Sequence, residues 1–496
     1  MNPRGPFVIV GDVLLDRDID GEVRRISPDA PVPVLDEESA TDRPGGAGLA
    51  ALLAAGDDYP VVLVTALADD DAGARLRDLL GAAGVTVYAL PLPGATAEKI
   101  RLRAAGQLLL RLDRGGTDPR PPGPAPDAAL AALRDAAVIL VSDYGRGVAR
   151  HPDLRTALET TRAPVVWDPH PRGPEPTPGT RLATPNEAEV RAFTGAGPGC
   201  GVTPLVAATR GGHQLRQRWR VGAVVVTMGA RGAVLCHTGP TPLVVSAPAA
   251  VGDTCGAGDR FAVAAARALA RGALVSEAVQ HAVARAADYV AAGGVATALP
   301  HRAGRGPTAP ADRAGGGPTA PADRAGGGVA TPAANGPRLA SRVVAEVRAR
   351  GGTVVATGGC FDLLHAGHVT TLQAARQLGD CLIVCLNSDA GVAALKGPDR
   401  PLTAQADRAR LLTALGCVDA VVMFDEPTPE AVLSWLRPDI WVKGGDYADG
   451  GPELPEAALV AEWGGQTVIV PYLDGRSTTN MIAAARAVAR QAEGAA

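Results

Sequence analysis

The sequence predicts an α/β fold arranged in two domains. Short β-branched runs alternate with Ala-, Leu- and Arg-rich stretches of helical character, on both sides of a segment rich in Gly, Pro and Ala. Continuous apolar runs of this kind build parallel sheets that helices cover on both faces. Polar residues gather directly after the runs. We therefore expect two sheets, each with ligand-binding residues at the carboxyl ends of its strands.

The first predicted domain covers residues 1–302. Its expected strands are Phe7–Val10, Val61–Val64, Val138–Val141, Val165–Trp167 and Val224–Val226. The polar residues that follow the strands are Gly11-Asp12, Ser142-Asp143, Asp168 and Thr227, and the short stretch Arg181–Ala183 leads into Thr184-Pro185-Asn186. Loops are polar in general, but this many polar strand ends favour an active site.

The second predicted domain covers residues 338–496. Its expected strands are Thr353–Ala356, Leu382–Leu386, Ala420–Phe424, Ile440–Val442 and Thr467–Val470. Between the domains, residues 303–337 contain a perfect tandem repeat of GPTAPADRAGG, at Gly306–Gly316 and Gly317–Gly327. This composition buries too little apolar surface to offset the entropy of ordering, and it predicts a flexible linker.

Composition excludes several classes of protein. The 496 residues carry a net charge of −4, without the basic surplus that a nucleic-acid partner requires. Only 3% of the residues are aromatic, which disfavours base-stacking surfaces. The seven cysteines form no CxxC pair. We expect neither a signal peptide nor a membrane span, because the first apolar stretch ends at Gly11-Asp12 and no apolar run is long enough to cross a membrane. These features predict a cytoplasmic protein with reduced thiols.

An anion cradle with a base is predicted at Asp253–Asp259, whose sequence is DTCGAGD. A strong helix former follows, so Gly256, Ala257 and Gly258 would expose backbone N–H groups at a helix N-terminus, where the dipole favours a phosphoryl group. Asp259 would lie in the first turn and accept the proton of an attacking hydroxyl. A Gly-rich turn with a capping Asp is the structural alternative.

The first domain resembles the ribokinase-like sugar kinases in its GG and (D/N)TxGAGD motifs. In more detail it resembles the bifunctional heptose 7-phosphate kinase/heptose 1-phosphate adenylyltransferases. The matching strings are GDVLLDR (Gly11–Arg17), RISPDAPVPV (Arg25–Val34), QLLLRLD (Gln107–Asp113), SDYGRG (Ser142–Gly147) and TPNEAE (Thr184–Glu189).

This resemblance implies a role for each matching residue. Asp259 would be the base on the anomeric hydroxyl, and Gly256, Ala257 and Gly258 would form the anion hole. The implied sugar-binding residues are Asp12, Gly45, Gly46 and Asp143, and the implied nucleotide-binding residues are Asn186, Glu189, Thr227 and Gly229. The chain departs from the family at Leu49, where Asn is usual, and at His170, where Lys is common. Both departures would alter sugar or phosphate contacts.

A histidine pair marks the second domain. In TGGCFDLLHAGH, His365 and His368 are three residues apart and would share one face of a helix. Two imidazoles beside helix N–H groups can hold a triphosphate and stabilise a pyrophosphate leaving group. A zinc site is the alternative, but no third ligand stands at a suitable spacing, so no resident metal centre is predicted.

The histidine segment resembles the HxGH motif of the nucleotidyltransferases, which have a Rossmann-like fold. Further matches are NSD (Asn387–Asp389), LKGPDRP (Leu395–Pro401), VKGGDY (Val442–Tyr447) and GRSTTN (Gly475–Asn480). The resemblance implies that His365, His368 and Lys443 are catalytic. The implied nucleotide-binding residues are Gly358, Phe361, Lys396, Arg400, Ser477, Thr478 and Thr479.

Together the two resemblances imply a bifunctional enzyme of ADP-heptose synthesis. Its substrates would be heptose phosphates and ATP, with Mg²⁺ at both sites and a monovalent cation left open. A homodimer is expected, because ribokinase-like enzymes are often dimers. Three other hypotheses stay open: the same layout with another sugar phosphate or with CTP, a sugar-sensing first domain that regulates the second, and a purely structural protein.

Overall fold

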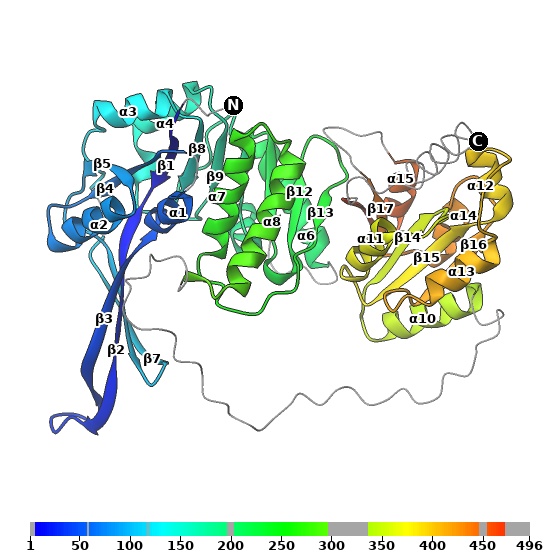
Figure 1. Cartoon of the computed structure of the whole chain (residues 1–496), viewed down its shortest axis with the longest axis horizontal. Helices are drawn as coiled ribbons and strands as arrows, with labels where there is room; N and C mark the ends of the chain where they lie inside the picture. The colour runs from blue at the N-terminus through cyan, green and yellow to red at the C-terminus, as the bar shows by residue number, and fades with distance from the viewer. Residues whose placement is uncertain are drawn as a thin grey trace, which may run out of the picture. The chain divides into compact units, whose positions relative to one another are not determined.

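The computed structural model describes residues 5–56, 59–116, 118, 120–195, 203–295, 336–445 and 454–471. These residues fall into two compact units (Figure 1). The first holds the described residues up to 295, and the second holds those from 336 onward. The predicted linker at 303–337 lies almost entirely outside the described residues, as does its tandem repeat. No helix among the described residues is long and apolar enough to cross a membrane.

The main sheet of the first unit has the strand order β13-β12-β11-β10-β9-β8-β1-β4-β5. Its strands are β1 Phe7–Gly11, β4 Val61–Leu67, β5 Val85–Pro91, β8 Val138–Ser142, β9 Val165–Asp168, β10 Leu182–Ala183, β11 Ala223–Thr227, β12 Ala233–Cys236 and β13 Leu243–Val245. All neighbours from β11 to β5 are parallel, and β12 and β13 are antiparallel. The mostly parallel sheet predicted from the apolar runs is therefore present.

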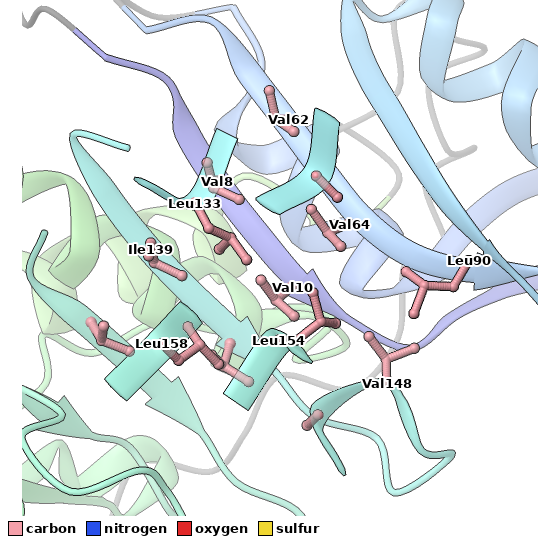
Figure 2. Packing of buried hydrophobic residues seen from close by; sticks show 14 of the residues in the cluster. Val8, Val10, Val62, Val64, Leu90, Leu133, Ile139, Val148, Leu154 and Leu158 are labelled. Atoms are coloured by element: carbon pink, nitrogen blue, oxygen red, sulfur yellow. The ribbon is translucent and has the colours of Figure 1, made fainter. Parts of the chain in front are cut away.

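Helices cover this sheet. They are α1 Ala47–Ala54, α2 Asp71–Ala82, α3 Asp127–Arg134, α4 Pro152–Thr160, α5 Glu187–Thr194, α6 Pro204–Trp219, α7 Ala257–Ala270 and α8 Val275–Ala291, with short 3₁₀ turns at Val148–Arg150 and Gly229–Arg231. Alternate residues of the strands, such as Val8 and Val10, pack on Leu133 of α3 and on Leu154 and Leu158 of α4 (Figure 2). Residues two apart in a strand share a face, so the spacing of these valines dictates one wall of the core.

A separate four-stranded sheet, which we call the small sheet, belongs to the same unit. Its order is β3-β2-β6-β7. The strands are β2 Val13–Ile26, β3 Pro33–Gly46, β6 Glu98–Ala104 and β7 Gln107–Arg114. The β2–β3 hairpin and β7 extend away from the main sheet of the unit (Figure 1). The sequence analysis did not predict this sheet, and the Pro-rich string Arg25–Val34 forms the tip of its hairpin.

The second unit has one parallel sheet of order β16-β15-β14-β17-β18. Its strands are β14 Val354–Gly359, β15 Cys381–Asn387, β16 Ala420–Phe424, β17 Ile440–Gly444 and β18 Gln466–Val470. Its helices are α10 Pro337–Ala349, α11 Ala366–Arg376, α12 Asp389–Lys396, α13 Gln405–Thr413, α14 Glu430–Leu436 and α15 Pro455–Glu462. The direction of winding reverses between β14 and β17, where open α/β sheets bind their ligands. All five predicted strands are present.

Candidate active sites

The switch point of the first unit lies between β1 and β8, and Asp12 and Asp143 follow these two strands. Asp12 is buried and accepts hydrogen bonds from the backbone N–H groups of Tyr144 (3.2 Å), Arg146 (2.9 Å) and Val148 (3.0 Å). Its carboxylate therefore fixes the loop that follows β8. The predicted contact of Asp12 with sugar stays a prediction.

Asp143 is buried and has one satisfied oxygen. Its Oδ1 accepts from the N–H of Gly145 at 2.8 Å, whereas Oδ2 has no hydrogen-bond partner among the described residues. Burial and the nearby Asp12 charge raise the pKa of Asp143 to about 7. Gly173 permits this arrangement, because a Cβ there would collide with Oδ2. An unpartnered buried carboxyl oxygen suits a ligand hydroxyl.

The GAGD segment forms the predicted helix N-terminus. Gly256 caps α7 with a φ of +77°, a conformation that L side chains rarely adopt. A Cβ on Gly256 would also lie 2.8 Å from Leu49 Cδ2 and from Tyr289 Oη. The N–H of Ala257 donates to the carbonyl of Thr254 at 3.1 Å, so this predicted anion-hole donor already has one acceptor.

Asp259 lies in the first turn of α7 and is 7% exposed. Tyr144 Oη is 3.0 Å and 3.1 Å from its two carboxylate oxygens. Burial raises the pKa of Asp259 to about 7, while the Tyr144 hydrogen bond opposes that rise by stabilising the carboxylate. A carboxylate with a pKa near neutrality is a suitable general base. Tyr144 was not singled out from the sequence, because its contact with Asp259 spans 115 residues.

Gly45 and Gly46 end β3 and lead into α1. Gly46 has a φ of +61°, and a Cβ on it would lie 2.5 Å from the Asp12 carbonyl and 3.4 Å from the Tyr144 ring. A Cβ on Gly45 would collide with the Asp16 carboxylate. The structure thus brings both glycines to the same edge as Asp12 and Tyr144, as the prediction requires. Their contact with sugar is untested.

The structure shows what surrounds Leu49 and His170, the two positions that depart from the family pattern. Leu49 is buried in α1 and packs on Gly256, so the position faces the predicted anion hole with an apolar side chain. His170 Nδ1 accepts from the N–H of Arg172 at 3.1 Å. Burial and the Arg172 charge lower the pKa of His170, so its imidazole is neutral at pH 7. His170 itself therefore supplies no fixed positive charge at this position.

The predicted nucleotide-binding residues of this unit lie on two neighbouring elements. Asn186 and Glu189 form a capping box at the start of α5, in which Asn186 Oδ1 accepts from the N–H groups of Ala188 and Glu189, and Glu189 Oε2 accepts from the N–H of Asn186. A parallel bridge places Asn186 beside Thr227, at the end of β11. Gly229 follows with a φ of +60°. The structure brings these four residues together.

Asp168 is within electrostatic range of both the predicted sugar-binding side and the predicted nucleotide-binding side of the first unit. Burial and the charges of Glu189, Asp259 and Asp143 raise the pKa of Asp168 well above its usual range, while a hydrogen bond from Thr184 opposes the rise. Carboxylates from the predicted sugar side and nucleotide side therefore lie within range of one another. The sequence predicts Asp168 only as a polar residue at a strand end.

The histidine pair of the second unit lies at the N-terminus of α11. His365 is the N-cap, and the helix begins at Ala366. The two imidazole rings stack with centroids 4.0 Å apart, as expected for side chains on one face. Burial, His365 and Lys396 lower the pKa of His368 to about 4. Lys396 is therefore close to the pair, as its predicted role requires.

Gly358 and Phe361 connect β14 to the histidines. A Cβ on Gly358 would lie 2.7 Å from the Trp441 ring. Phe361 has a φ of +44°, and its ring lies 5.2 Å from that of His368. Holding a bulky residue in the left-handed region costs about 1–3 kcal/mol and occurs mainly at functional sites. Phe361 thus borders the histidine pair, whereas Gly358 lies against Trp441.

Two predicted phosphate-binding cations have protein partners in this state. Arg400 Nε pairs with Asp362, whose buried carboxylate also accepts from the N–H groups of Leu402 and Thr403. Lys443 Nζ lies 2.7 Å from Glu456 Oε1, and Glu456 is buried. Their contacts with phosphate stay predictions. Asp362 and Glu456 were missed in the sequence because each partner lies on another element.

Arg408 is a further residue that the sequence analysis missed. It is 1% exposed and donates to the carbonyls of Cys360, Asn387 and Thr403, and its Nη2 lies 2.7 Å from Asp389 Oδ1. It therefore ties the HxGH loop to the end of β15. The predicted phosphate-binding residues Ser477, Thr478 and Thr479 lie outside the described residues.

Comparison with known proteins finds two family models that match the chain. The pfkB family carbohydrate kinases match residues 7–302, and the cytidylyltransferase-like family matches residues 356–469. The bifunctional protein HldE of Streptomyces coelicolor is 52% identical over 99% of this chain and 98% of its own length. The corresponding protein of Azorhizobium caulinodans is 37% identical over 97% and 98%.

One solved structure similar to this chain is an Arabidopsis thaliana ribokinase complexed with ribose and ATP. It is 24% identical, covers 61% of this chain and 97% of its own, and superposes with a TM-score of 0.48.

Proposed function

The chain belongs to the bifunctional HldE family, a pfkB-type carbohydrate kinase joined to a cytidylyltransferase-like nucleotidyltransferase, and we propose that its two units act on heptose phosphates in separate pockets. Residues 1–302 would phosphorylate O1 of D-glycero-β-D-manno-heptose 7-phosphate. Residues 338–496 would join heptose 1-phosphate to AMP from ATP, giving ADP-heptose and pyrophosphate. The observation that carries the kinase half is the buried Asp259 at the N-terminus of α7.

In the kinase step, Asp259 takes the proton of the O1 hydroxyl as O1 attacks the γ-phosphorus of ATP, and ADP leaves. The positive end of α7 and the N–H groups at Gly256–Gly258 stabilise the charge on the phosphoryl group in transit. Tyr144 orients the carboxylate, because its hydroxyl reaches both oxygens. Asp143 and the glycine pair support the sugar beside them.

The residues present fit a magnesium ion bound with ATP. No group of three or more His, Cys, Asp or Glu side chains in the described residues forms a ready metal cage. Mg²⁺ in nucleotide sites needs only one or two carboxylates besides the phosphates. Glu189, which uses only Oε2 in the cap, and Asp168, whose neighbours raise its pKa, would hold the ion. When bound, it would neutralise charge on the ATP phosphates.

In the adenylyl transfer, a phosphate oxygen of heptose 1-phosphate attacks the α-phosphorus of ATP in line, and pyrophosphate leaves. His365, His368 and Lys396 would hold the phosphates and stabilise the leaving group. His368 is neutral at pH 7 without nucleotide, since its pKa is about 4. A bound triphosphate would favour its protonated form. The family likeness adds further residues to those proposed to contact the phosphates, namely Arg400, Lys443 and residues 477–479.

Both steps use ATP, and the six described cysteines are free thiols, which supports a cytoplasmic location.

A homodimer is also proposed. Strand β7 is an edge of the small sheet, and it exposes Leu108, Leu109, Leu110 and Leu112 by 41–56%. An exposed apolar edge strand is a template for pairing with a second chain.

The dimer proposal has a direct test. L110E places a charge on β7, and we expect light scattering to report half the mass of the wild-type protein. L411E, at an exposed position of α13 in the other unit, should leave the mass unchanged. A monomeric wild-type protein, or an L110E protein that is still dimeric, would contradict the proposal.

The pH dependence of the kinase step tests the base. Asp259 must be deprotonated, and its pKa is about 7, so kcat/KM should rise with pH below 7 and level off above it. Tyr144→Phe removes a hydrogen bond that favours the carboxylate, so the inflection should move to higher pH. An inflection that stays in place in the Phe variant would show that Tyr144 does not act through Asp259.

Mass spectrometry of the products decides the overall function. With heptose 7-phosphate and ATP, we expect a heptose bisphosphate alone. Added 7-phosphatase should convert the product to ADP-heptose. A nucleotide product formed only with CTP, or turnover of another sugar phosphate in place of heptose 7-phosphate, would replace the proposed substrates.

A further inference from the structure

One face of the small sheet carries a network of charges. Cross-strand partners share a face, and the register pairs Arg43 with Asp16, Asp16 with Lys99, and Lys99 with Asp113. The next row on the same face contains Asp18, Arg101 and Arg111. We call these seven residues the charged face of the small sheet.

The charged face borders the kinase site. The Asp16 carboxylate lies where a Cβ of Gly45 would stand. The charges of Asp16 and Lys99 both act on the pKa of Asp259, Asp16 raising it and Lys99 lowering it. Asp16 and Arg101 likewise act on the pKa of Cys255, in the loop that precedes the proposed anion hole. The face is therefore within electrostatic range of the proposed base.

The arginines of the charged face are paired. Arg43 pairs with Asp18, Arg101 lies 2.8 Å from Asp16 and 3.5 Å from Asp18, and Arg111 lies 2.7 Å from Asp113.

Lys99 is the exception. It is half-buried, yet no carboxylate in the described part of the chain forms an ion pair with it. Burial lowers the pKa of its ammonium and so do Arg111 and Arg101, while the charges of Asp16 and Asp113 oppose that shift. The charged face thus holds four cations and three carboxylates, and Lys99 is the cation left without an ion pair among the described residues. An anionic ligand would supply the missing charge to this half-buried ammonium.

We propose that Lys99 binds the phosphate that the sugar substrate already carries before it enters the kinase site. The inference rests on the proposed function, in which the sugar presents O1 to Asp259 and bears a phosphate at its other end. A phosphate dianion offers acceptors for the three donors of the ammonium and the charge that the face lacks. Lys99 would thus select phosphorylated sugars over unphosphorylated ones.

The test compares heptose 7-phosphate with unphosphorylated heptose in the full-length protein. For K99M, KM for heptose 7-phosphate should rise about 10- to 100-fold, the loss expected for one charge-assisted contact, with kcat nearly unchanged. Turnover of unphosphorylated heptose should not fall. K99R, which keeps the cation, should lose much less. R114M, which removes a cation from the opposite face of the same sheet, should behave as wild type.

The outcomes separate the inference from its premise. A wild-type protein that phosphorylates no sugar phosphate would overturn the proposed function and this inference together. A wild-type protein that is active, with an unchanged KM in K99M, would overturn the inference alone. K99Q, measured in the same way, replaces K99M if the methionine variant does not fold. Equal losses on both sugars would also overturn the inference, because they indicate a general role in the sheet.

Discussion

Replacing Asp259 with Asn is expected to abolish phosphorylation at O1 while the synthesis of ADP-heptose from heptose 1-phosphate continues at the wild-type rate. Asn keeps the shape of the side chain and can still contact Tyr144, but it cannot accept the proton of the hydroxyl. Loss of a general base costs about 10²–10⁴-fold in rate. Coupled ADP release measures the first step, and pyrophosphate release measures the second.

A matched control is D288N, which changes an exposed carboxylate of α8 and should leave both rates unchanged. Because Asp259 is buried with a raised pKa, its Asn variant should fold at least as well as wild type at pH 8, where the wild-type protein must hold a buried charge. Kinase turnover retained in D259N would exclude Asp259 as the base.

Replacing His365 with Ala should have the opposite effect. Adenylyl transfer should fall about 10²–10³-fold, the usual cost of removing one donor that stabilises transition-state charge. The stack with His368 is also lost, so nucleotide affinity should decrease. Phosphorylation at O1 should continue unchanged, because His365 belongs to the second unit.

The control for this variant is Q373A, an exposed position of the same helix. It should leave pyrophosphate release at the wild-type rate. Loss of kinase activity in H365A, with Q373A fully active, would contradict independent sites.

Much of the fold could be predicted because buried parallel strands are continuous apolar runs. Val61–Val64, Val138–Val141 and Ala420–Phe424 all lie within strands of the structure. The small sheet could not be predicted in this way. Strands β2, β3 and β6 mix charged with apolar residues, and the leucines of β7 lie exposed, so these strands lack the long buried apolar runs of a parallel core sheet. Their pairing depends on partners far apart in the chain, such as Leu15 with Glu98.

The residues of the candidate sites likewise fall into those that the sequence predicts and those that only the structure shows. Residues marked by local motifs, such as Gly256, Asp259, His365 and His368, lie where the sequence placed them at helix N-termini. The partners of the motif residues were not visible, because they lie far away in the sequence: Tyr144 contacts Asp259, Asp362 pairs with Arg400, and Glu456 pairs with Lys443. A local motif predicts which side chains take part in the chemistry, but the residues that orient those side chains are seen only in the folded structure.

Leu49 illustrates a limit of motif likeness. Its side chain packs on Gly256, so the apolar residue that replaces the family's Asn contributes to the core beneath the helix N-terminus. Any sugar contact that the Asn makes in relatives must come here from another residue. Asp143, whose Oδ2 has no partner among the described residues, is a polar candidate on the same edge.

The central claim is that one chain holds two phosphate-handling sites that work without each other. The direct test mixes D259N and H365A proteins with heptose 7-phosphate, ATP and a 7-phosphatase, and follows ADP-heptose by mass spectrometry. Neither variant alone should make ADP-heptose, and the mixture should make it, because the intermediate diffuses from the intact kinase site of one protein to the intact transferase site of the other. A mixture that makes none, although each variant keeps its single activity, would contradict the account.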